Sequence, residues 1–143
     1  MRYGRWVAID LFCVLVGAVS GCASAGSKPD LEAFLGTWRG SSTCVNRQVA
    51  PACKDEVVVY DIRRSEKPAT AILNADKVVD GQRMPMGELE FVYDAKEGCW
   101  RSEIRTERVH AMWSLRVAGN TMTGHLRDIP ANADTREVKL TRD

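Results

Sequence analysis

The stretch that decides the fold is WSLRVAGNTMTGHL, residues 113–126. Gly119-Asn120 is a dipeptide typical of two-residue hairpin turns, and apolar residues alternate with polar ones on both sides of it. A turn there pairs Ala118 with Thr121. Counting outward from that pair places six residues on one face: Trp113, Leu115, Val117, Met122, Gly124 and Leu126. The opposite face carries Met112, Ser114, Arg116, Thr123, His125 and Arg127. One apolar face and one mostly polar face predict an antiparallel hairpin in the wall of a barrel or sandwich.

The same alternation extends over the rest of the chain. It predicts strands over residues 36–44, 56–64, 69–79, 82–94, 99–106, 109–118, 121–128 and 135–142. Asp80-Gly81 indicates a second hairpin that pairs Val79 with Gln82, and Pro85-Met86-Gly87 predicts a bulge or an edge break in the next strand. This series of short strands predicts an all-β fold. Because the connections are short, we expect an eight-stranded antiparallel up-and-down barrel over residues 31–143. Asp30 can cap a short helical turn before the first strand.

Five aromatic residues fall at inward-facing positions of this pattern. They are Tyr60, Phe91, Tyr93, Trp100 and Trp113. The interior of an eight-stranded barrel is wide enough for side chains or for one small ligand. These aromatics therefore either line a ligand pocket or fill a packed core, and both alternatives stay open because periodicity gives facing and not volume.

The N-terminus carries the features of an export signal. Arg2 and Arg5 precede an apolar run from Val7 to Val19 that is too short to span a bilayer. Val19-Ser20-Gly21-Cys22 then resembles the lipobox of bacterial lipoproteins. That resemblance implies a signal peptide over residues 1–21, acylation of Cys22, a lipidated tether over residues 22–30 and anchoring in the cell envelope. In a Gram-negative cell it implies the periplasmic face of the outer membrane. An ordinary cleaved signal and an uncleaved anchor are the alternatives.

Charge and cysteine content narrow the possible partners. Removal of residues 1–21 takes away Arg2, Arg5 and Asp10, which leaves equal numbers of basic and acidic residues. A nucleic-acid partner then has no electrostatic support. We also expect the protein to be a monomer.

In an exported protein Cys44 and Cys53 are expected to form a disulfide across a short loop. Cys99 is either a buried free thiol or the true partner of one of these two.

Two short motifs near the ends of the predicted barrel suggest a family. Gly36-Thr37-Trp38 opens the first strand, and Arg142 ends the last. This pattern resembles that of lipocalin-type (calycin) barrels, and it implies that Trp38 closes the barrel floor while Arg142 packs across its ring. Gly-Thr-Trp also opens avidin-type barrels and some bacterial protease-inhibitor barrels. The resemblance implies a binding protein.

The sequence contains no motif that predicts catalysis. Ser114 and His125 face each other on the outer side without a third group, and the carboxylates of Glu103 and Glu107 also point outward. No phosphate loop, dinucleotide fingerprint or metal-ligand spacing is present. We therefore expect that the protein has no enzymatic activity and binds no cofactor or metal ion.

Two functions remain as hypotheses. The first is an envelope-anchored lipoprotein whose barrel binds an apolar small molecule or a lipid. The second is a protein-interaction module, either an inhibitor of a hydrolase or an accessory of an envelope assembly, with a packed core. It would act through the loop of residues 45–52 or through Met84-Pro85-Met86.

Overall fold

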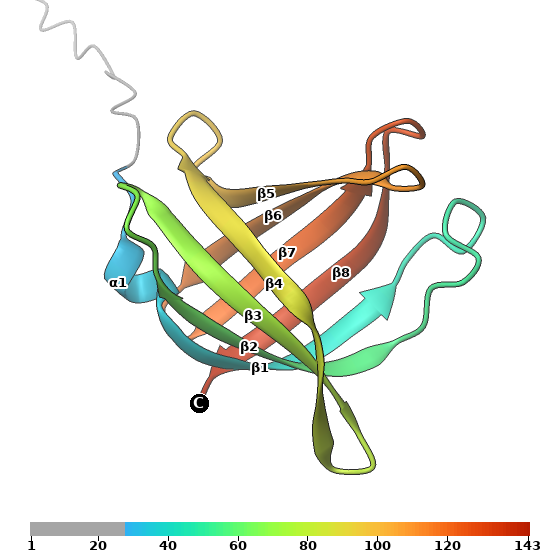
Figure 1. The fold of residues 1–143 in the computed structure, drawn as a ribbon, viewed down its shortest axis with the longest axis horizontal. Helices are drawn as coiled ribbons and strands as arrows, with labels where there is room; N and C mark the ends of the chain where they lie inside the picture. The colour runs from blue at the N-terminus through green and yellow to red at the C-terminus, as the bar shows by residue number, and fades with distance from the viewer. Residues whose placement is uncertain (1–27) are drawn as a thin grey trace, which may run out of the picture.

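The computed structural model describes residues 28–143. The predicted signal peptide, the lipidation site at Cys22 and most of the predicted tether lie outside the described residues. The described chain forms a closed barrel of eight antiparallel strands that follow one another in sequence order (Figure 1). This confirms the predicted up-and-down barrel and is compatible with a lipocalin-like fold. Residues 28–143 include no helix with the length and hydropathy that a membrane crossing needs.

The elements follow the predicted ranges closely. They are α1 (Leu31–Phe34), β1 (Gly36–Cys44), β2 (Glu56–Arg64), β3 (Thr70–Val79), β4 (Gln82–Asp94), β5 (Cys99–Arg105), β6 (His110–Ala118), β7 (Thr121–Asp128) and β8 (Ala133–Arg142). The largest difference is at β8, which begins two residues before the predicted start. A shift of register after Leu126 lets Ala133 pair with Asp128 and so extends the ladder beyond the regular alternation.

Both predicted hairpins have the expected register. β6 and β7 pair Ala118 with Thr121, and every pair counted outward to Met112 and Arg127 is present. β3 and β4 pair Val79 with Gln82 across Asp80 and Gly81, which both have positive φ as a type I′ turn requires. The predicted bulge is also there. Ala75 faces Gly87 and Asp76 faces Pro85, so Met86 is the extra residue on β4.

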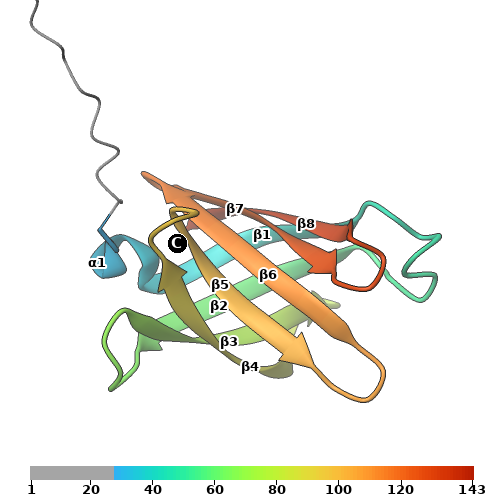
Figure 2. The same cartoon turned by 90° about the horizontal axis from the view of Figure 1, so that it is seen from above.

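The two ends of the barrel differ. We call the end that carries α1 the capped end; the connections β2–β3, β4–β5 and β6–β7 also lie there. We call the other end the mouth, which is formed by the connections 45–55, 80–81, 106–109 and 129–132. Figure 2 shows α1 at one end of the barrel and the β1–β2 loop at the other.

Aromatic packing fills the capped end. Phe34 of α1 is fully buried and stacks on Trp100, with ring centroids 4.4 Å apart. The indole N–H of Trp38 donates to the carbonyl of Phe34 at 3.0 Å. The guanidinium of Arg142 lies 4.3 Å from the centroid of the Trp38 ring and donates to the carbonyls of Ala33 and Leu35. One arginine thus joins the last strand to the first strand and to α1.

β1 and β8 close the barrel by pairing residues 38–44 with residues 136–142. Gly40 lies in this seam opposite Leu140. A Cβ atom at Gly40 would lie 2.0 Å from the carbonyl oxygen of Lys139 and 2.9 Å from the Cα of Leu140. The seam therefore needs a residue without a side chain at this position.

Candidate functional site

The mouth half of the barrel holds a cavity of about 410 Å³, which lies within the size range of small-molecule sites. Its wall is mostly apolar and contains three of the five predicted aromatic residues, Tyr60, Phe91 and Trp113. Leu73, Ala75, Met86, Gly87, Leu89, Ile104, Leu115 and Leu126 also line it, together with the polar residues Ser42, Glu56, Glu88 and Arg136. The barrel therefore has a packed core at the capped end and a cavity toward the mouth.

The other two predicted aromatic residues lie elsewhere. Trp100 stacks on Phe34 at the capped end, and Tyr93 meets Trp100 edge to face with centroids 5.2 Å apart. Neither lines the cavity. Both face inward, as alternation predicts, but their height along the barrel axis places them beside α1.

Four polar side chains meet on the cavity wall, and we call this group the polar corner: Ser42, Glu56, Tyr60 and Arg136. The Nη1 atom of Arg136 donates to the hydroxyl oxygen of Ser42 at 2.8 Å and to Oε2 of Glu56 at 3.2 Å. Nη2 donates to the carbonyl of Lys54 at 2.8 Å. The side chains of Arg136 and Glu56 are only 15% and 23% exposed. The ion pair between Arg136 of β8 and Glu56 of β2 is thus mostly buried at the cavity wall.

Sequence reasoning did not select Arg136, Glu56 or Ser42 as site residues. The available signal was the position of Arg136, which shares the inward facing of the buried Val138 and Leu140 on the same strand. A charged residue in an inward series is costly to bury without a partner. The partner could not be read from the sequence because Glu56 is 80 residues away.

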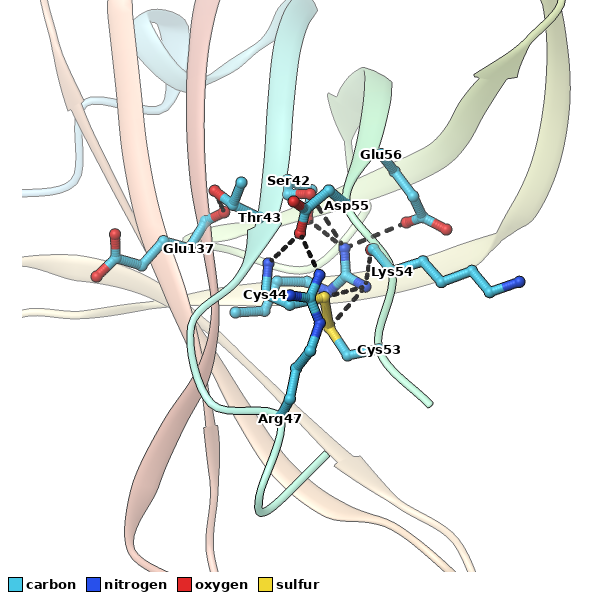
Figure 3. Close-up of polar contacts among 10 residues, drawn as sticks. Ser42, Thr43, Cys44, Arg47, Cys53, Lys54, Asp55, Glu56 and Glu137 are labelled. Atoms are coloured by element: carbon cyan, nitrogen blue, oxygen red, sulfur yellow. Dashed lines mark hydrogen bonds and ion pairs between the residues drawn. A yellow bond between two sulfur atoms is a disulfide. The ribbon is translucent and has the colours of Figure 1, made fainter. Parts of the chain in front are cut away.

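A disulfide supports the polar corner from the β1–β2 loop. Cys44 and Cys53 are bonded, as predicted, and Cys99 is a buried free thiol. Nη2 of Arg136 lies 3.2 Å from the sulfur of Cys53. Figure 3 shows Ser42, Cys53, Lys54 and Glu56 grouped around one guanidinium. Asp55 accepts hydrogen bonds from the backbone N–H of Cys44 and from the side chain of Arg47. The loop that covers this side of the mouth is therefore fixed both covalently and by hydrogen bonds.

Tyr60 places a neutral hydroxyl group in this corner. It is 5% exposed, and burial raises its pKa to about 12 although the nearby charge of Arg136 acts in the opposite direction. The hydroxyl of Ser42 is also within hydrogen-bonding reach of it. At neutral pH Tyr60 is therefore protonated and can both donate and accept a hydrogen bond.

The charges of the polar corner are balanced, because Arg136 pairs with Glu56. The third charged lining residue, Glu88, has a half-exposed side chain and pairs at 3.2 Å with Arg63, which is not part of the cavity wall. The cavity thus combines an apolar body with one polar corner that has no net charge.

The outer wall carries the remaining groups considered in the sequence. Ser114 and His125 face each other across β6 and β7. Glu103 pairs with His110 at 2.7 Å, and Arg101 pairs with Asp94, whose pKa it lowers by hydrogen bonding. Within residues 28–143 no group of three or more His, Cys, Asp and Glu side chains is placed so that it could hold a metal ion.

Exposed apolar side chains surround the mouth. Each of the four mouth connections carries at least one, in the loop or beside the turn. We call this set the apolar rim: Val45, Val79, Met84, Met86, Val109 and Ile129. Large apolar side chains gathered around an opening are a feature of surfaces that meet a partner or a ligand.

No protein-family model matches this chain, and a search of curated proteins finds no match.

Proposed function

We propose that this protein is an envelope-anchored lipoprotein whose barrel binds an apolar small molecule or a lipid. The observation that carries the proposal is the cavity of about 410 Å³, whose wall is mostly aliphatic and aromatic. Cavities of this size and composition are typical of small-molecule sites. Burial of apolar ligand surface contributes about 25 cal/mol per Å², which makes such a cavity a favourable environment for a lipid-like molecule.

The anchoring part of the proposal is supported by the lipobox-like stretch that ends at Cys22. Two acyl chains give stable membrane attachment, whereas one gives only marginal attachment. Mass spectrometry of the protein extracted from membranes tests this part. An N-terminal peptide that begins with a diacylated or triacylated Cys22 supports it, and a mature N-terminus at another residue contradicts it.

Native mass spectrometry tests ligand binding. The protein purified from its own envelope is expected to carry excess mass that is lost on denaturation. Ala75→Phe places a large side chain in the cavity and should remove this mass. Ile72→Phe changes the outer face of the same strand and serves as the matched control. Loss of the excess mass in both variants, or in neither, contradicts binding in the cavity.

The apolar rim favours a second function, that of a protein-interaction module. Six exposed large side chains lie around one end of a rigid barrel, and methionine side chains adapt easily to a partner surface. Cross-linking in intact cells tests this function. The double substitution Met84→Ser and Val109→Ser should abolish a cross-linked adduct while ligand occupancy is unchanged. If the adduct persists, the rim is not the interaction surface.

A catalytic role is not part of the proposal. The Ser114–His125 pair lies on the opposite side of the sheet from the cavity. That pair therefore lies outside the space in which the proposed ligand would bind.

A further inference from the structure

Resting on the proposed binding function, we propose that the polar corner selects ligands with an uncharged hydrogen-bonding headgroup, such as a hydroxyl or an amide, on an apolar body. The ion pair in the corner carries no net charge, and Arg136 is already held by Ser42, Glu56 and the carbonyl of Lys54.

Both Nη atoms of Arg136 already donate to protein groups. Its guanidinium already binds Ser42 on β1, Glu56 on β2 and the carbonyl of Lys54. An anionic headgroup would have to displace Glu56 and would then lie beside a carboxylate that had lost its partner. Leaving a buried charge without its partner is strongly unfavourable, so this exchange is disfavoured.

A cationic headgroup meets the opposite problem. It could approach Glu56, but the guanidinium of Arg136 lies 3.2 Å from the same carboxylate and would repel the cationic headgroup. The pair as a whole is neutral, so a neutral headgroup is the only kind that adds no net charge to a largely apolar cavity.

The corner still offers hydrogen bonds to a neutral group. Arg136 binds Oε2 of Glu56, so Oε1 can accept a hydrogen bond from a ligand. The Tyr60 hydroxyl lies on the same wall and is protonated at neutral pH. A hydroxyl or an amide both donates and accepts, which matches this combination. Sites built from buried polar groups reject analogues that leave those groups unpaired.

The test compares three probes with the same alkyl chain: 1-decanol, decanoate and decylammonium. Isothermal titration calorimetry measures their affinities at pH 7 in the purified protein. Because an alcohol is intrinsically more apolar than the ions, the decisive quantity is the affinity ratio of an ion to decanol, compared between wild type and variants. This ratio cancels the contribution of the chain.

Glu56→Gln carries the test because it removes the carboxylate and keeps its shape. It leaves the charge of Arg136 uncompensated, so the decanoate-to-decanol ratio should rise about tenfold or more. Arg136→Gln should raise the decylammonium-to-decanol ratio similarly. Glu90→Gln is the control for net charge, because Glu90 pairs with Lys67 on the outer wall. It should change neither ratio.

The outcomes separate the two proposals. If decanol binds and neither ratio changes in Glu56→Gln, the polar corner does not select for headgroup charge and the inference is overturned. If none of the three probes binds wild type, the proposed binding function itself fails. Circular dichroism melting of each variant verifies that it is folded. Glu56→Gln alone decides the matter if Arg136→Gln does not fold.

Discussion

Substitution of Gly40 by alanine should destabilise the barrel far more than its small size suggests. The new Cβ would lie 2.0 Å from the Lys139 carbonyl oxygen, whereas real Cβ atoms essentially never come within 3.0 Å of a heavy atom outside their own residue and its chain neighbours. β1 and β8 must therefore separate by about 1 Å at the seam that closes the barrel. We expect about two weakened ladder hydrogen bonds, at about 1 kcal/mol each, and about 1–3 kcal/mol of overpacking around the buried Leu140.

The total loss is about 3–5 kcal/mol. For a domain of this size it corresponds to a fall in Tm of about 12–20 °C. Gly119→Ala is the matched control. Gly119 has a φ of +60° but no atom within 4 Å of its ideal Cβ, so alanine there carries only the left-handed backbone cost of about 1–2 kcal/mol. Thermal melting and urea unfolding, both followed by circular dichroism, compare the two variants. If Gly40→Ala is no less stable than Gly119→Ala, the close approach of β8 does not determine the choice of glycine at this position.

Three further predictions concern stability. Because burial raises the pKa of Tyr60 from 10.0 to about 12, the unfolded chain deprotonates first as the pH rises. The resulting stabilisation of roughly 3 kcal/mol is complete below about pH 10 and is lost between about pH 10 and 12. Urea unfolding of Tyr60→Phe should lack this loss, and an unchanged pH dependence would contradict it. Arg142→Ala removes a cation–π contact with Trp38 and leaves two carbonyls without their donor. It should lower the free energy of unfolding by about 2–4 kcal/mol. Arg142→Lys should restore only part of this stability, because lysine lacks the planar guanidinium. Full restoration by lysine would mean that the positive charge alone stabilises the barrel. Double replacement of Cys44 and Cys53 by serine opens a loop with a sequence separation of 9 and should cost about 2–3 kcal/mol. If reductant lowers wild-type stability without affecting this variant, the disulfide is the cause; equal sensitivity of both refutes it.

The hairpin at Gly119-Asn120 explains why the wall could be predicted from the sequence. Alternation has a period of two residues, so one turn position fixes which residue faces which along both strands. The pairs from Ala118–Thr121 to Met112–Arg127 follow from that single choice, and all are present. The extension of β8 to Ala133 was missed because the register shift after Leu126 interrupts the period.

The interior was less predictable for a different physical reason. Facing does not give height along the barrel axis, which depends on the tilt and stagger of all eight strands. The sequence pattern therefore predicts the same inward facing for Trp100 and Trp113 and does not distinguish their positions. In the structure Trp100 stacks on Phe34, while Trp113 lines the cavity. The volume of the cavity depends likewise on packing that periodicity does not specify. The pairing of Arg136 with Glu56 joins strands from opposite ends of the chain, which a local pattern does not reveal.

Both ends of the described chain lie at the capped end. Lys28 precedes α1 near Gly98 and Gly119, and the backbone N–H of Asp143 donates to the carbonyl of Thr37. Protein attached to a sensor chip through either end would therefore stand with its opening toward the analyte. A short linker could join the two ends into a ring, and new ends could then be cut into the 129–132 connection. Such a circular permutant would keep every strand of the barrel intact.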